Sequence, residues 1–165
     1  MFMTESEKRA KLVEFGSQIL YKKSLPEGLP HIARYAKEVI GADRCSMFIY
    51  SPKNSEFWTT LADGVERIVI SADTGIVGET LKTQKAIIEN DVHSNPSFFE
   101  GVDTKTGYKT RNIVTAPIFN IDKEIVGVLE LLNKDGGFDE NDVRHMTFFS
   151  KSLSDFIDLI NLYEG

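Results

Sequence analysis

Residues 113–133 have the sequence Ile-Val-Thr-Ala-Pro-Ile-Phe-Asn-Ile-Asp-Lys-Glu-Ile-Val-Gly-Val-Leu-Glu-Leu-Leu-Asn. Two runs of apolar and β-branched residues flank a short polar turn, which is the pattern of a β-hairpin. We therefore expect strands over residues 113–119 and 125–133, joined by a turn at residues 120–123.

A long polar connection precedes this hairpin. Residues 90–112 are Asn-Asp-Val-His-Ser-Asn-Pro-Ser-Phe-Phe-Glu-Gly-Val-Asp-Thr-Lys-Thr-Gly-Tyr-Lys-Thr-Arg-Asn. Compact domains rarely contain such a stretch unless it is functional, typically as a lid or a binding loop. With the segments 130–134 and 138–140 that follow, it indicates a small-ligand receptor rather than a catalyst.

Further strands and helices are expected upstream and downstream. Strand patterns cover residues 44–50, 57–61, 67–71 and 86–89, and Asp73-Thr-Gly-Ile-Val-Gly78 opens a short helix that reaches about residue 83. A capping box at Thr4 and Glu7 begins a helix to about residue 23. A second helix covers residues 29–40 after a break at Pro26 and Pro30, and a last one covers residues 139–163.

This order predicts an α+β fold. A central antiparallel sheet should carry the N- and C-terminal helices on one face and the ligand-covering helices and loops on the other. We expect a single domain over residues 1–165, with an N-terminal helix and connection (1–28), a core (29–138) and a C-terminal helix (139–165).

Composition narrows the classes of function. The chain has 165 residues, of which 41% are hydrophobic and 27% charged, as in an ordinary globular protein. Its net charge of −6 disfavours nucleic acid as a partner. No apolar run approaches the roughly 20 residues that span a bilayer, and the start lacks a signal-peptide pattern. One cysteine, Cys45, excludes an internal disulfide and favours the cytoplasm.

The sequence resembles a GAF domain from about Leu29 to its end. The resemblance rests on Asn133-Lys134 followed by Phe138-Asp139-Glu140, and on the segments 73–78, 93–103 and 106–112. It is similar to the cyclic-nucleotide-binding GAF domains of mammalian phosphodiesterases and cyanobacterial adenylyl cyclases. The loop 135–137 is shorter than usual in that family, and an upstream Phe of the family is missing.

The resemblance implies a cyclic nucleotide, cGMP or cAMP, as the ligand. It also implies that Lys134 and Asp139 form a structural ion pair that does not touch the nucleotide. The backbone amides of Ile76 and Val77, at a helix start with Gly75 and Gly78, would receive the phosphate. An ordinary helix start without a ligand is the alternative.

The long connection supplies the next set of candidates. Asp103, Thr106 and Thr110 match positions that approach the ribose and phosphate in the relatives, and Phe99 stands where the relatives have Tyr. Asp and Thr side chains also commonly bind the backbone of their own loop, which is the competing interpretation.

Three strand positions are candidates for contacting the base. Ser46 and Asp63 match base-contacting positions in the relatives, and Glu130 matches a position that lines the pocket. An ionised Asp63 accepts hydrogen bonds only, which favours the two adjacent donors of guanine. Asp63-Gly64 also forms a plain hairpin turn by pattern. For Glu130 the alternatives are an ion pair with Arg111 or exposure on the sheet face.

We do not expect the protein to be an enzyme, to contain a metal site or to carry a cofactor. Cys45 has no resolving partner for thiol chemistry, and there is no nucleophile-elbow sequence. The three histidines, His31, His93 and His145, lack metal-site spacing.

Dimerisation is expected along the terminal helices. Apolar residues recur three and four apart in the last helix, and Leu12, Phe15 and Ile19 repeat the spacing in the first. The positions in the last helix are Met146, Phe149, Leu153, Phe156, Ile160 and Tyr163. We expect a regulatory domain that signals to an attached effector domain, and the leading alternative is a ligand-free dimerisation module.

Overall fold

The computed structural model describes residues 2–19, 25–62, 69–98 and 107–164. Its elements in chain order are α1 (Glu5–Ile19), α2 (Leu25–Ile40), β1 (Arg44–Ser51), β2 (Glu56–Ala62), β3 (Val69–Ser71), α3 (Gly75–Thr83), β4 (Ile87–Glu89), the 3₁₀ turn η1 (Val92–Ser94), β5 (Ile113–Phe119), β6 (Ile125–Leu132) and α5 (Glu140–Glu164). The predicted hairpin is confirmed as β5 and β6, and each expected strand is present within a few residues of its predicted bounds.

The six strands form one antiparallel sheet in the order β3-β2-β1-β6-β5-β4. The two central strands are β1 and β6, and β6 pairs with β1 on one side and with β5 on the other. In these pairings Glu130 is the Cα partner of Ser46 on one side and of Thr115 on the other. Because side chains alternate between faces along a strand, this register decides which residues share a surface.

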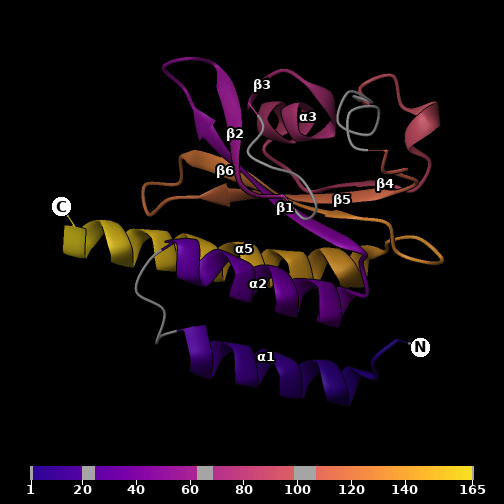
Figure 1. Ribbon diagram of the computed structural model, residues 1–165, viewed down its shortest axis with the longest axis vertical. Coiled ribbons are helices and arrows are strands. Elements are labelled where there is room, and N and C mark those ends of the chain that lie inside the picture. Colours follow the sequence, from indigo (N-terminus) through magenta and orange to yellow (C-terminus); the bar gives the residue numbers. More distant parts are fainter. Residues whose placement is uncertain (1, 20–24, 63–68, 99–106, 165) are drawn as a thin grey trace.

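Helices cover both faces of the sheet, as predicted (Figure 1). The helices α2 and α5 lie on one face, and α3 lies on the other. The main core fills the space between the sheet and α2 and α5, and includes Met47, Val114 and Leu131 from the strands. The α+β prediction is confirmed.

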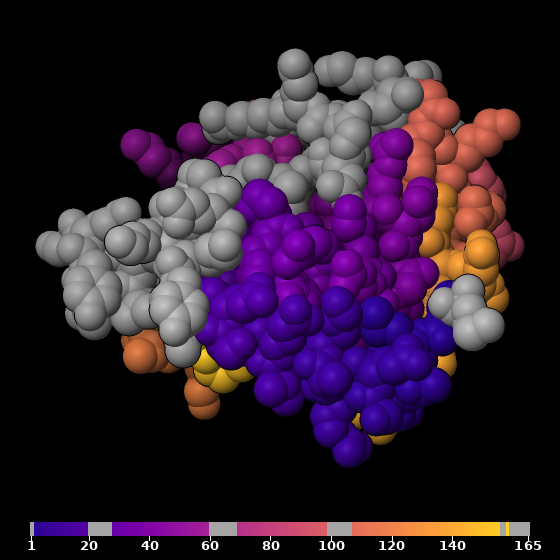
Figure 2. Space-filling model, turned by 60° about the horizontal axis from the view of Figure 1, so that its bottom comes forward, coloured from indigo at the N-terminus to yellow at the C-terminus, as the bar shows by residue number. Residues whose placement is uncertain are grey.

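The first helix forms an outer layer rather than covering the sheet itself. In Figure 1 α1 lies beyond α2, and Figure 2 shows it in indigo across that side of the molecule. Phe15 anchors it, because its fully buried ring packs against the rings of Tyr35 on α2 and Phe149 on α5. Thr4 caps the helix as predicted, since its Oγ1 accepts a hydrogen bond from the amide of Glu7 at 3.1 Å.

The predicted break at Pro26 and Pro30 is wrong. The second helix begins at Leu25 and contains Pro30, so it is a turn longer than expected. Proline removes one helical hydrogen bond, here to the carbonyl of residue 26 in the first turn. The buried stripe that includes Leu29, Ile32 and Ala36 holds the helix against the sheet and outweighs that single loss.

Candidate functional site

A row of polar side chains crosses the centre of the sheet on the face that carries α3. Leu129 and Leu131 point into the core under α2 and α5, so Glu130 between them points to the opposite face. Its neighbours on that face are Ser46, which is buried, and Thr115, which is fully buried. Glu130 itself is half-buried. The structure therefore brings two predicted residues, Ser46 and Glu130, together as direct neighbours.

The proposed alternative partner of Glu130 binds elsewhere. The Nη2 atom of Arg111 lies 3.6 Å from Oδ1 of Asp135, and both side chains are mostly exposed. The ion pair between Arg111 and Glu130 that the sequence left open is thus replaced by a pair with Asp135. Glu130 remains a carboxylate on the α3 face of the sheet, at the middle of the polar row.

The first turn of α3 packs against the sheet on both sides of Glu130. Ile76 packs in a cluster with Leu132, and Val77 packs in a cluster with Val128. Val128 and Leu132 are the residues two before and two after Glu130 on the same strand, so the first turn of the helix is anchored on both sides of it. The buried side chains of Ile76 and Val77 explain why apolar residues occupy the start of this helix.

The backbone at this helix start requires its glycines. Gly75 has a φ of +67°, in the left-handed region that glycine adopts without strain. A Cβ atom on Gly78 would lie 2.6 Å from the carbonyl carbon of Asp73. The amide of Gly78 is the first to bond within the helix, to the carbonyl oxygen of Thr74 at 3.0 Å. The preceding amides, which include those of Ile76 and Val77, therefore have no intrahelical acceptor.

A hydroxyl pair joins α3 to the polar row. Oγ1 of Thr80 lies 2.6 Å from Oγ1 of Thr115, and it donates to the carbonyl oxygen of Ile76 at 2.9 Å. Both threonines are fully buried. The sequence analysis missed this pair. The alternation of β5 places Thr115 on the face of Glu130, but nothing in the sequence pairs it with a helix residue 35 positions earlier.

The signature Asn133 holds the end of the long connection. Its Oδ1 accepts hydrogen bonds from the amides of Arg111 at 2.7 Å and Asn112 at 3.2 Å. Its Nδ2 donates to the carbonyl oxygen of Lys109 at 2.8 Å and to the hydroxyl of Tyr108 at 2.9 Å. One buried amide side chain thus binds four of the five residues 108–112.

The start of the long connection is held by residues 133–138, which we call the signature loop. Nδ2 of Asn90 donates to the carbonyl oxygen of Phe138 at 3.0 Å, and Oδ1 of Asn90 accepts from the amide of Phe138 at 2.8 Å. Phe138 is buried in the main core. Residues 133–138 therefore bind both ends of the connection, a role that the sequence analysis did not foresee.

A second contact secures the end of the connection to β1. The hydroxyl of Tyr108 donates to Oδ2 of Asp43 at 2.6 Å, and the guanidinium of Arg44 lies 3.7 Å from the centre of the Tyr108 ring. Burial and the neighbouring Asp43 carboxylate raise the pKa of Tyr108 to about 12. The phenol therefore keeps its proton, and its hydrogen bond to Asp43, at neutral pH.

The predicted ion pair between Lys134 and Asp139 is wrong. Nζ of Lys134 lies 2.7 Å and 2.9 Å from the two carboxylate oxygens of Asp142, and both side chains are buried. Asp139 instead caps α5. Its Oδ1 accepts a hydrogen bond from the amide of Asp142 at 3.0 Å, and this bond lowers the pKa of the Asp139 carboxyl group. In return, Oδ2 of Asp142 accepts a hydrogen bond from the amide of Asp139 at 2.9 Å. Glu140 is exposed in the first turn.

Of the remaining predicted ligand contacts, one lies among the residues that the structure describes and four do not. Thr110 is buried just before β5. Asp63, Phe99, Asp103 and Thr106 lie outside the residues that the structure describes. Within the described ranges, no cluster of His, Cys, Asp and Glu has the composition of a metal site, and no helix is both long and apolar enough to cross a membrane.

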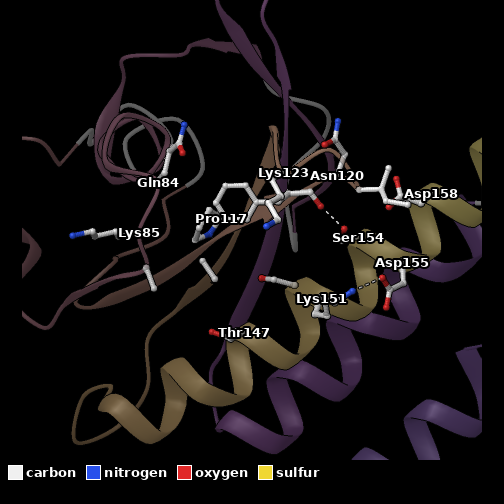
Figure 3. A pocket seen from close by; sticks show the side chains of 15 residues that line it. Gln84, Lys85, Pro117, Asn120, Lys123, Thr147, Lys151, Ser154, Asp155 and Asp158 are labelled. Atoms are coloured by element: carbon white, nitrogen blue, oxygen red, sulfur yellow. Dashed lines mark hydrogen bonds and ion pairs between the residues drawn. The ribbon is translucent and has the colours of Figure 1, made fainter.

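A separate groove lies between the sheet and α5 (Figure 3). It has a volume of about 1070 Å³ and runs between α5 and the edge of β5 that β4 leaves uncovered. Pro117 and Phe119 line its sheet side, and Ser150, Lys151 and Asp158 line its α5 side. None of the predicted ligand contacts that the structure describes lines this groove.

Comparison with known proteins identifies relatives of the whole chain and of part of it. A profile of the GAF domain matches residues 24–155. Two proteins named cGMP-specific 3′,5′-cyclic phosphodiesterase, from Drosophila melanogaster and Drosophila pseudoobscura pseudoobscura, are each 37% identical over 102 residues. That match covers 54% of this chain and 9% of each relative, so the chain spans less than a tenth of their length.

Solved structures share the fold at low identity. The GAF domain of a phosphoenolpyruvate-protein phosphotransferase from Coxiella burnetii has a TM-score of 0.84 at 16% identity, over 95% of this chain and 96% of that one. A free methionine-R-sulfoxide reductase from Neisseria meningitidis, in complex with its substrate, has a TM-score of 0.83 at 18% identity, over 99% and 97% of the two chains.

Proposed function

The chain belongs to the GAF family of regulatory domains, and we propose that it is a sensor that binds a cyclic mononucleotide, with cGMP favoured over cAMP. The observation that carries this proposal is the position of Glu130. It lies between the hydroxyl-bearing Ser46 and Thr115, beneath a helix start whose first amides have no intrahelical acceptor. The phosphodiesterases similar to this chain are named as cGMP-specific, which supports the choice of nucleotide.

The polar row suits the edge of guanine. An ionised carboxylate accepts hydrogen bonds only, whereas serine and threonine hydroxyls can donate or accept. Guanine presents two adjacent donors on its Watson–Crick edge, so Glu130 can pair with both. Adenine presents one donor beside an acceptor, and that acceptor would face the carboxylate unpaired, which costs affinity.

The start of α3 suits the phosphate. A cyclic nucleotide carries one diffuse negative charge, and helix N-termini bind such anions through free amides and the helix dipole. Ile76 and Val77 would supply these amides. Asp103, Thr106 and Thr110 would approach the ribose and phosphate, with Phe99 as apolar cover.

Binding would act through the long connection. Both of its ends are held by residues 133–138, which lead directly into α5. Ordering this connection over a ligand would bias α5, and through it an attached effector domain. The bias cannot exceed the difference in ligand affinity between the two states of the domain.

Thermal unfolding with and without ligand tests the proposal. Free cGMP at about 100 times its dissociation constant should stabilise the domain by about 2.7 kcal/mol, an upward shift of several degrees. Cyclic AMP and cyclic dinucleotides should shift the transition less. Protein shown to be free of co-purified nucleotide that responds to none of these would contradict the sensor proposal.

Exchanging the carboxylate of Glu130 for an amide tests the base contact. Gln offers a donor and an acceptor, so Glu130→Gln should weaken cGMP binding by about tenfold and leave cAMP binding unchanged or improved. Titration calorimetry with both nucleotides measures the ratio. Glu7→Gln, an exposed change on α1, is the control. An unchanged ratio of cGMP to cAMP affinity would remove Glu130 from the site.

The groove in Figure 3 favours one alternative, a homodimer through the terminal helices. Its occupant would be α5 of a second copy. An antiparallel pairing of two α5 helices around Ser154 places Lys151 near Asp158 of the other copy, and both residues line the groove. Lys151→Glu should then weaken the dimer in sedimentation experiments, and the further change Asp158→Lys should restore it. If the wild-type protein sediments as a monomer at a concentration of about 100 µM, the dimer is excluded.

A further inference from the structure

The contact between Thr80 and Thr115 is the one polar contact that the described structure shows between α3 and the sheet's polar row. It lies where both side chains are fully buried, so water does not compete for it. Thr115 is the register partner of Glu130 on β6. Thr80 lies one turn after Ile76 and binds its carbonyl oxygen. The register pairing of β5 with β6 therefore places Thr115 beside Glu130, and the two hydroxyls link Thr115 to the first turn of α3.

The protons in this path have a single consistent arrangement. A threonine hydroxyl has one proton to donate and can accept from others. Thr80 uses its proton on the carbonyl oxygen of Ile76 at 2.9 Å. Thr115 must then donate to Thr80 across the 2.6 Å contact. Removing the Thr80 hydroxyl leaves the proton of Thr115 without this acceptor, whereas removing the Thr115 hydroxyl leaves the proton of Thr80 satisfied.

We propose that Thr80 and Thr115 are positioning residues that fix the first turn of α3 relative to Glu130. The pair sets the spacing between the amides of Ile76 and Val77 and the carboxylate of Glu130. Thr80 itself does not need to touch the ligand. The consequence for ligand binding rests on the proposed function, but the effect on the placement of α3 does not.

The apolar contacts of α3 do not by themselves fix the position of its first turn. Ile76 and Val77 pack in separate apolar clusters on either side of Glu130. Apolar contacts resist separation of the helix from the sheet, but they are not directional. A short hydrogen bond with defined donor and acceptor is directional, so it can select one position of the helix along the sheet. The hydroxyl pair supplies that selection.

Valine substitutions test the proposal, because valine keeps the shape of threonine and removes its hydroxyl. Hydrogen exchange of the ligand-free protein is measured for Thr80→Val, Thr115→Val and the double variant. A buried hydroxyl without a partner costs the most, so Thr80→Val should raise exchange in residues 75–83 by about tenfold. Thr115→Val should raise it less. The double variant, in which neither hydroxyl remains, should resemble Thr115→Val rather than the sum of the two.

The affinity for cGMP should follow the same order. Thr80→Val should lose about tenfold and Thr115→Val less. Thr115→Ser, which keeps the donor, should keep hydrogen exchange in residues 75–83 at the wild-type level. A residue that only filled the core would loosen the whole domain. Exchange in residues 75–83 that stays at the wild-type level in all three variants, or exchange that rises equally in β1 and α5, would overturn the proposal. If wild-type protein binds no cGMP, the sensor proposal fails, and the exchange pattern alone still decides whether the pair positions α3.

Discussion

Replacing Lys134 with alanine should lower the free energy of unfolding by about 3–5 kcal/mol, because the change leaves the carboxylate of Asp142 buried without its cation. The pair is short at both oxygens, 2.7 Å and 2.9 Å, and only 1% of the Asp142 side chain is exposed. Urea unfolding followed by circular dichroism measures the loss. Asp142→Ala should cost a similar amount, because it strands the ammonium group of Lys134 in the same place.

Two other changes separate this ion pair from weaker interactions. Lys151 and Asp155 on α5 also lie 2.7 Å apart, but 72% and 64% of their side chains are exposed. Lys151→Ala should therefore cost less than about 1 kcal/mol. Asp139→Ala removes a helix cap and should cost about 1 kcal/mol. If Lys134→Ala costs no more than Lys151→Ala, the buried pair does not hold the signature loop to α5.

A paired replacement tests whether the charges themselves stabilise the fold. Lys134→Met with Asp142→Leu fills the same space without burying an unpaired charge. Such replacements are often neutral or stabilising. The double variant should therefore recover most of the stability that either single change loses. A loss equal to the sum of the two single losses would show that the two side chains contribute independently and are not coupled as a buried pair.

The choice of Asp142 over Asp139 shows where sequence reasoning ended. The segment Phe138-Asp-Glu-Asn-Asp142 places three carboxylates in the first turn of a helix, and any of them is close to Lys134 in sequence. The residue at the N-cap points its side chain back at the helix amides, so Asp139 is committed to the cap. Asp142, three residues later in the first turn, points at Lys134. The pattern predicts the helix and its carboxylates, but their directions depend on which residue is the cap.

The strands were predictable for a simpler reason. Runs of apolar and β-branched residues bounded by a polar turn predicted β5 and β6. For Glu130 the sequence left open a pocket position, an ion pair with Arg111 and exposure, and the register of β6 with β1 and β5 decides its face. The helix-side partner of Thr115 did not follow, because it depends on how α3 settles on the sheet. Pro30 was misjudged in the same way, since a local preference against helix was outweighed by the burial of neighbours such as Ile32.

Replacing Asn133 with alanine should cost about 3 kcal/mol or more, because several buried backbone groups lose their partner at once. Its side chain binds the amides of Arg111 and Asn112 and the carbonyl oxygen of Lys109. Its φ of +58° adds strain for alanine, since asparagine tolerates this region better. Hydrogen exchange should rise first in residues 107–112, and the affinity for cGMP should fall with it.

Asn133→Gly separates the two causes, because glycine accepts the positive φ and still lacks the side chain. If the hydrogen bonds dominate, Asn133→Gly should remain almost as destabilised as Asn133→Ala. Asn120 is the matched control: its Oδ1 also accepts two amides, from Asp122 and Glu124, but in an exposed turn where water can replace it. Asn120→Ala should therefore cost less than about 1 kcal/mol. Equal losses at the two asparagines would mean that Asn133 satisfies a turn and does not hold the connection in place.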